Sequence, residues 1–216
     1  MAGPGDDDLA AALVKALKTY GHERLELEFR LGHRAPGGFV PGVSEGAWDA
    51  LKARLDQSCG EGKAFRLVTT DTRELISGDG SGAKYVIDKA GATPPFWMRK
   101  QRLWDVDRDT GTPWGCRASA SLEVVDPPQA QPRPPPGTHR FERHKQRWSY
   151  RHRCWAFDLT RVASNLPHQL DNDSVSFEVE MELADPSELF ARPVPNLLEW
   201  AHAMIHDLCA MMAPPV

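Results

Sequence analysis

Two short stretches, Leu25-Glu26-Leu27-Glu28-Phe29 and Phe177-Glu178-Val179-Glu180-Met181-Glu182-Leu183, alternate carboxylates with large apolar side chains. This period of two predicts a β-strand in each stretch, with the glutamates on one face and the apolar residues on the other. Neighbouring carboxylates repel one another unless a cation lies between them, so the spacing is also typical of ligands for a hard divalent metal. The alternative is an antiparallel sheet with one acidic face in solvent.

A third segment has the same period but the opposite charge. From Arg143 to Arg151, every second position carries arginine or lysine, except for Ser149. Cations at this spacing favour a polyanionic ligand such as a chain of phosphates. If the two acidic rows and the basic row all face inward, they line a charged lumen that holds metal and phosphate together. If they face outward, they are ordinary solvated strand faces.

The composition sets the class of protein. A chain of 216 residues that is 41% hydrophobic and 26% charged is typical of a globular protein, and we expect one domain over residues 1–216. The formal net charge of −4 argues against a sequence-independent coat for nucleic acid. Four scattered cysteines indicate neither a zinc cluster nor a disulfide framework. Without a signal region or an apolar run of roughly 18 residues, we expect a soluble intracellular protein and no membrane contact.

Hydrophobic periodicity predicts the order of the elements. Amphipathic helices are expected at about residues 9–20, 44–57 and 194–211, and a loop from Gly32 to Gly42. Short alternating runs between about Ala64 and Val125, broken by glycine, proline and aspartate, predict a meander of antiparallel strands. Further strands follow at residues 143–151, 155–162 and 177–183. The proline-rich tract 126–137 cannot continue a strand and is expected to form an extended loop within the domain.

Four motifs in order resemble those of the fungal and protozoan RNA 5′-triphosphatases, which are triphosphate tunnel metalloenzymes. They are E-x-E-x-R at residues 26–30, R-x-K-x-R-x-S-Y at 143–150, D-x-T at 158–160 and E-x-E-x-E at 178–182. The resemblance covers most of the chain. It implies an α+β, mainly β, fold in which an eight-stranded antiparallel β-barrel with a few flanking helices turns its charged rows into a tunnel. It also implies metal-dependent hydrolysis of the γ-phosphate of triphosphate-ended RNA, the first step of mRNA 5′ capping.

The same resemblance assigns roles to the acidic residues. It implies that Glu26, Glu28 and Glu182 bind a divalent metal, Mg²⁺ or Mn²⁺. Glu180 and Glu123 correspond to the pair that orients or activates the attacking water. Because Glu180 lies between Glu178 and Glu182, we expect its acidic neighbours to raise its pKa so that it can accept the proton of that water.

The basic residues are expected to contact phosphate, with Lys145 and Arg147 as the clamp on the γ-phosphate. The full set of implied phosphate contacts is Lys84, Lys100, Arg102, Arg143, Lys145 and Arg147. The implied supporting residues are Arg30, Asp158, Thr160 and Glu178, the last through a salt bridge to a basic residue. Two positions depart from the family pattern, because Ala156 and Lys84 stand where arginines are expected. Arg151 or Arg153 is expected to fill the first gap in space.

Two other functions remain open at this point. One is a hydrolase of small triphosphates, such as nucleoside triphosphate, tripolyphosphate or thiamine triphosphate. The other is a barrel that binds a phosphorylated ligand without cleaving it, which the acidic rows disfavour. For the capping function we expect triphosphate-ended RNA as substrate, nucleoside triphosphate as an accessory substrate and a nuclear location. A cytoplasmic or viral setting, a separate guanylyltransferase chain and a homodimer are left open.

Overall fold

The computed structural model describes residues 6–21, 23–126, 139–165, 174–191 and 193–212. Nine strands lie in these ranges: β1 (Leu25–Ala35), β2 (Gly38–Pro41), β3 (Arg66–Ser77), β4 (Lys84–Asp88), β5 (Phe96–Asp109), β6 (Gly115–Asp126), β7 (His139–His152), β8 (Trp155–Asn165) and β9 (Ser174–Leu183). The helices in these ranges are α1 (Asp6–Tyr20), α2 (Glu45–Gln57), α3 (Glu188–Ala191) and α4 (Val194–Met212).

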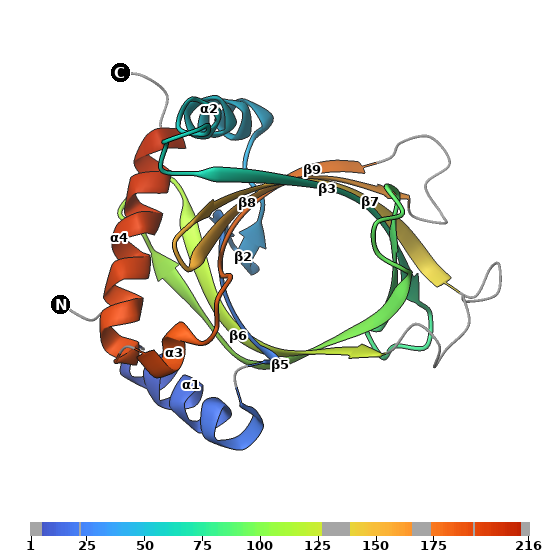
Figure 1. Ribbon diagram of the computed structural model, residues 1–216, viewed down its shortest axis with the longest axis horizontal. Coiled ribbons are helices and arrows are strands. Elements are labelled where there is room, and N and C mark those ends of the chain that lie inside the picture. Colours follow the sequence, from blue (N-terminus) through green and yellow to red (C-terminus); the bar gives the residue numbers. More distant parts are fainter. Residues whose placement is uncertain (1–5, 22, 127–138, 166–173, 192, 213–216) are drawn as a thin grey trace.

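The strands form one sheet in the order β2-β1-β6-β5-β4-β3-β7-β8-β9. All neighbouring strands are antiparallel, and β1 also pairs with β9. This additional pairing closes the eight strands other than β2 into a barrel, seen end-on in Figure 1. The predicted mainly β fold with an eight-stranded antiparallel barrel is confirmed.

The register shows which side chains face the tunnel, because directly opposed residues lie on the same face of a sheet. Where β1 closes on β9, Glu28 lies opposite Glu182 and Arg30 lies opposite Glu180. The residues between the glutamates face the other way, and Leu27 is 0% exposed. The charged rows therefore face inward, and the apolar rows form the outer face of the barrel.

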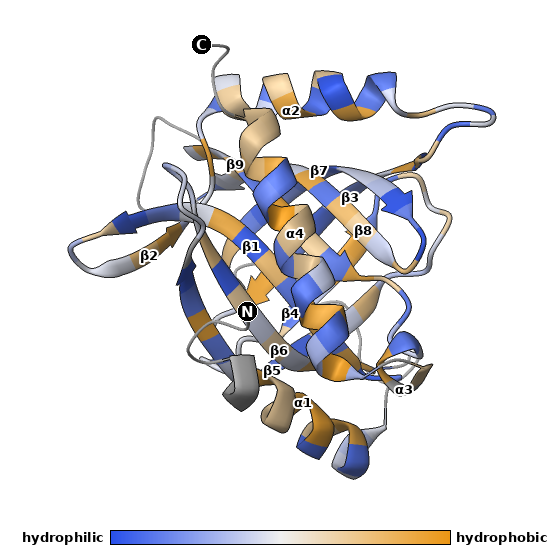
Figure 2. Ribbon diagram, turned by 90° about the vertical axis from the view of Figure 1, so that its left-hand side faces the viewer, coloured by the Kyte–Doolittle hydropathy of each residue, from blue (hydrophilic) through white to orange (hydrophobic). Residues whose placement is uncertain are grey.

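Three helices cover that outer face. Figures 1 and 2 show α4 along one side of the barrel, with α2 near one end of α4 and α1 near the other. The side chains of Phe29 and Trp155 pack edge to face beneath α4, with ring centroids 6.1 Å apart, and Trp155 also contacts Trp200 of α4. The main hydrophobic core thus lies between barrel and helices, which leaves the barrel interior for polar side chains.

The predicted helices are confirmed, and the N-terminus of α2 has the expected cap. The side chain of Ser44 accepts a hydrogen bond from the backbone N–H of Ala47 at 3.4 Å. None of the helices within the described ranges is long and apolar enough to span a membrane. The single domain over residues 1–216 stays a prediction, and the loop expected at residues 126–137 falls almost wholly outside the described residues.

The loop expected from Gly32 to Gly42 is wrong. Strand β1 continues to Ala35 and pairs with β2 as a hairpin, in which Gly32 lies opposite Pro41. Gly32 has no side chain, and this allows β1 and β2 to approach closely in the hairpin. The β2 strand is the one strand of the described sheet that lies outside the barrel.

Replacement of Gly32 by alanine is expected to lower the free energy of unfolding by about 1–3 kcal/mol through overpacking. A Cβ atom at this position would overlap the carbonyl oxygen of Val40 and lie 2.9 Å from the Cα of Pro41, and backbone atoms cannot rotate away. The matched control is Gly46→Ala in α2, where nothing lies within 4 Å and helix propensity favours alanine. Urea unfolding of both variants tests this, and equal stabilities would contradict it.

Candidate active site

A cavity of about 350 Å³ lies in the tunnel and is lined mostly by charged and hydroxyl side chains. Seven of the barrel strands contribute to it, and β8, which pairs with β7 and β9 in the wall, supplies no lining residue. The structure brings most of the predicted site residues to this cavity. The predicted residues that do not line it are Arg102, Glu178, Asp158 and Thr160.

Lys100 of β5 lies among the carboxylates predicted to bind metal. Its Nζ is 2.5 Å from Glu26 and 3.2 Å from Glu28, both on β1, and 3.9 Å from Glu123 on β6. Burial disfavours the ammonium, but Glu28 and Glu26 outweigh burial and raise the pKa of Lys100 above its usual range. The spacing of the acidic side chains predicts a cation between them. In this structure the cation is the ammonium of Lys100.

Glu182 is the acidic residue of the tunnel whose charge is least compensated. It forms no ion pair or hydrogen bond with any described residue, although it lines the cavity. Burial, together with the nearby carboxylates of Glu26 and Asp158, raises the pKa of Glu182 to about 8. The pKa of Glu28 is also raised, mainly by burial and by Glu180. Both carboxylates would be stabilised by an additional cation.

The raised pKa of Glu182 predicts a pH-dependent stability in chelator. Its folded-state pKa of about 8 lies above the ordinary value of 4.5, so the ionised form opposes folding increasingly as pH rises between these values. We expect Glu182→Gln to be more stable than the native protein at pH 8, with a difference that shrinks toward pH 4.5. Thermal unfolding of both proteins across this range tests the expectation, and a pH-independent difference would contradict it.

Glu180 is the centre of an ion-pair network in the tunnel wall. It is 5% exposed and accepts a hydrogen bond from Nε of Arg30 at 2.8 Å, while Nη2 of Arg147 lies 3.2 Å from its other oxygen. Each arginine has a second acidic partner. Arg30 is 2.8 Å from Glu28, and Arg147 is 2.7 Å from Asp158. The network fixes the guanidinium of Arg147 at the edge of the cavity.

The expected raised pKa of Glu180 is wrong. Burial acts to raise it, but Arg30 and Arg147 outweigh burial and hold the pKa of Glu180 well below its usual range. A carboxylate in this state is a poor acceptor for the proton of an attacking water. Glu178 makes no direct ion pair with the described residues, and its Oε2 is buried without a hydrogen bond, but its charge favours the ammonium of Lys145 at longer range.

The basic side of the cavity contains a residue that the sequence did not single out. Glu74 of β3 is 4% exposed and lies 2.7 Å from Lys84 and 3.8 Å from Lys145. Lys84 stands where the family pattern has arginine. In this structure it pairs with Glu74. Burial lowers the pKa of Lys145 in spite of the opposing effect of Glu74. A phosphate would therefore gain from contact with the poorly solvated ammonium of Lys145.

The remaining predicted residues have clear positions. Asp158 and Thr160 both contact Arg147, whose Nε donates to the Thr160 hydroxyl at 3.1 Å. Arg143 lines the cavity, whereas Arg102 has a 69% exposed side chain and pairs with Asp105 at 3.0 Å. The structure does not bring Arg102 to the site.

Arg151 lies opposite Ala156, the position where the family pattern has arginine, on the tunnel-facing side of the sheet. Arg153 instead stacks on Trp200 outside the barrel, at 5.7 Å from the ring centroid. Of the two arginines expected to fill the gap, Arg151 is the one in position.

The donor set fits a hard divalent ion. Glu26, Glu28 and Glu182 offer only carboxylate oxygens, which Mg²⁺ and Mn²⁺ prefer. In the described part of the chain, no three acidic, histidine or cysteine side chains already converge as metal ligands do. The ammonium of Lys100 lies between Glu26 and Glu28, two of the three proposed ligands. Coordination would require Lys100 to leave that position.

Comparisons with known proteins agree with this geometry. Residues 98–193 match the family model for the mRNA capping enzyme, beta chain. A 5′ RNA triphosphatase of Paramecium bursaria Chlorella virus 1 is 29% identical over 196 residues, which cover 91% of this chain and 94% of the relative. The structure of the S. pombe RNA triphosphatase superposes with a TM-score of 0.78 at 17% identity, covering 96% of this chain and 93% of that one. The mimivirus capping enzyme triphosphatase gives a TM-score of 0.65 at 13% identity, covering 97% and 99%. The chain is therefore similar over residues 98–193 to the mRNA capping enzyme beta chain and over most of its length to a viral 5′ RNA triphosphatase, and its barrel has the fold of the solved RNA triphosphatases.

Proposed function

We propose that this chain hydrolyses the γ-phosphate of triphosphate-ended RNA, the first step of mRNA 5′ capping. The observation that carries the proposal is that one cavity in the tunnel is lined by carboxylates on one side and by lysine and arginine on the other. Cleavage of a terminal phosphoanhydride needs both neutralisation of the transferring phosphoryl group and a positioned water. The viral relative, named as a 5′ RNA triphosphatase, and the capping-enzyme family model support the same substrate.

In this proposal, different residues of the cavity bind phosphate, position other side chains and hold the metal. Lys145 and Arg147 bind the γ-phosphate, and Glu180 holds Arg147 in place. Glu26, Glu28 and Glu182 would hold Mg²⁺ or Mn²⁺, which supplies Lewis-acid polarisation of a phosphate oxygen when bound. Lys100 then moves from these carboxylates to the substrate's phosphates.

Glu123 orients the attacking water in this scheme. Its carboxylate lies at the acidic end of the cavity, 3.9 Å from Lys100, and has no closer cationic partner among the described residues. This leaves its oxygens available to accept hydrogen bonds from water once Lys100 has moved. Glu180, whose oxygens are engaged by two arginines, is not available in this way.

Release of labelled γ-phosphate tests the proposal directly. We expect release from triphosphate-ended RNA in Mg²⁺ or Mn²⁺, none in chelator, and a higher kcat/KM for RNA than for ATP. Preference for ATP or tripolyphosphate over RNA would instead identify a small-triphosphate hydrolase. Tight triphosphate binding without release under either metal, by protein shown to be folded, would identify a binding module.

The biological setting is part of the proposal. We propose nucleoside triphosphate as an accessory substrate and a nuclear location, and a separate guanylyltransferase chain and a homodimer stay open alternatives to a lone monomer. Co-purification with a guanylyltransferase, light scattering of the isolated protein and imaging of the tagged chain test these separately.

A further inference from the structure

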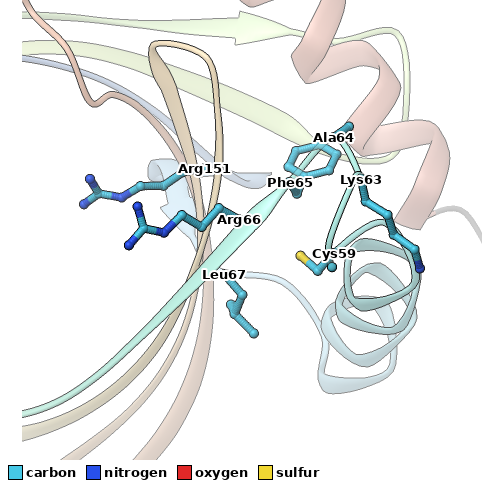
Figure 3. A pocket seen from close by; sticks show the side chains of 8 residues that line it. Cys59, Lys63, Ala64, Phe65, Arg66, Leu67 and Arg151 are labelled. Carbon is cyan, nitrogen blue, oxygen red and sulfur yellow. The ribbon is translucent and has the colours of Figure 1, made fainter.

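Two arginines form an unusual pair beside the active site. Arg66 on β3 and Arg151 on β7 are direct cross-strand partners, and both line a second cavity of about 480 Å³ at the start of β3. Figure 3 shows their side chains extending side by side in the same direction, away from Cys59. Like charges directly opposite each other on a sheet repel and are destabilising. The pair therefore has an energetic cost unless an anion binds between the two guanidinium groups.

No described carboxylate lies in direct contact with the pair to supply that anion. Both arginines are exposed, and neither forms an ion pair with a described residue. The tunnel cations differ in this respect, because Arg30, Lys100 and Arg147 each contact at least two carboxylates. Arg151 acts on the carboxylate of Asp158 only at longer range, so Arg66 and Arg151 provide two exposed positive charges that no described residue pairs directly and that a ligand can reach.

The position of the pair relates it to the active site. Along one row of the register, Arg66 lies opposite Arg151, Arg151 opposite Ala156, and Ala156 opposite Glu182. Adjacent strands are about 4.8 Å apart, so the backbone of Arg151 is about 10 Å along the barrel wall from Glu182, and that of Arg66 about one strand farther. Members of such a row share the tunnel-facing side. The pair therefore continues the charged lining beyond the cavity that would hold the triphosphate.

Building on the proposed function, we propose that Arg66 and Arg151 bind backbone phosphodiester groups of the RNA downstream of its 5′ triphosphate. An RNA end carries phosphodiesters beyond its first nucleotide, whereas a free nucleoside triphosphate has none to place there. The planar guanidinium binds phosphate through two parallel hydrogen bonds, and two adjacent groups can hold one or two phosphates. The pair thus gives the tunnel a preference for RNA ends over free nucleotides.

Binding of product RNA tests this inference without any chemistry. Affinity for a diphosphate-ended oligonucleotide is measured by fluorescence anisotropy over a range of salt, for the native protein and for Arg66→Gln/Arg151→Gln. We expect the double variant to bind about tenfold more weakly, with a slope of log K against log salt smaller by about 1.4, since each single-strand phosphate contact contributes about 0.7. The control Lys15→Gln/Arg54→Gln removes two exposed charges from α1 and α2 and is expected to bind like the native protein.

A length series tests the effect on specificity. For triphosphate-ended RNAs of increasing length, KM is expected to fall as downstream phosphates are added, and the double variant is expected to flatten this dependence. In the glutamine double variant, the ratio of kcat/KM for RNA to kcat/KM for ATP should fall about tenfold. The ratio for Arg66→Lys/Arg151→Lys should lie between the native and the glutamine values. Native affinity, salt slope and length dependence in the glutamine variant would overturn the inference. Failure of the native protein to release phosphate would refute the proposed function, while the binding measurement would still test the arginine pair.

Discussion

Replacement of Glu182 by glutamine is expected to lower metal-dependent γ-phosphate release on the order of 10³-fold, which corresponds to about 4 kcal/mol of lost transition-state stabilisation. Glutamine has nearly the same shape but provides no anionic oxygen, so one of three proposed metal ligands is lost. The tunnel should remain folded. Glu182 makes no ion pair or hydrogen bond with a described residue, and Glu26 and Asp158 disfavour its charge.

Two measurements are needed, because loss of activity alone would not identify a metal ligand. Calorimetric titration with Mn²⁺ is expected to show a large loss of affinity in Glu182→Gln, and circular dichroism is expected to be native. The matched control is Glu178→Gln, which changes the same residue type on β9 at a tunnel-facing position opposite Thr160. It should retain metal binding. Native turnover and unchanged Mn²⁺ affinity in Glu182→Gln would refute the assignment.

Much of the fold was predictable because a period of two determines the face on which each strand residue lies. Once Glu26 and Glu28 are placed on one face of a strand, their apolar neighbours must lie on the other, and the buried Leu27 shows this. Glu74 was overlooked for a local reason. The short alternating runs expected between Ala64 and Val125 did not show that one strand, β3, continues to Ser77 and turns Glu74 inward.

The partners of each charge were not predictable from local sequence. Glu180 has acidic neighbours two positions away on its own strand, which suggested a raised pKa. Its nearest contact is Arg30, which is 150 residues away in the chain and is brought beside Glu180 when β1 closes on β9. Barrel closure therefore reverses the direction of the pKa shift. The same holds for Lys100, whose position between Glu26 and Glu28 depends on the register of three strands.

Replacement of Glu180 by alanine is expected to lower the free energy of unfolding by about 3–5 kcal/mol, the range found when one partner of a buried ion pair is removed. The change leaves the half-buried guanidinium groups of Arg30 and Arg147 with one acidic partner each. Activity should fall as well, because Arg147 loses a contact that fixes it against the cavity. Urea unfolding and γ-phosphate release on the same preparation measure the two effects.

A double variant separates the structural from the chemical role of Glu180. In Arg30→Met/Glu180→Met, apolar side chains of similar volume replace a buried pair, and such exchanges are often neutral or stabilising. We expect stability to recover to within about 1 kcal/mol of native while activity stays low. A double variant as unstable as Glu180→Ala would show that packing alone cannot replace the network, against this expectation.

The pH dependence of the reaction distinguishes positioning from proton transfer. A general base contributes an acidic limb to the pH profile of kcat/KM at its own pKa. Because Arg30 and Arg147 hold the pKa of Glu180 well below the usual range, Glu180 should remain ionised throughout the working range and contribute no limb there. Glu180→Gln is therefore expected to lower kcat/KM by the same factor at every pH, without changing the shape of the profile. Disappearance of an acidic limb in this variant would restore Glu180 as the base and would require that substrate binding draws the two arginines away from it.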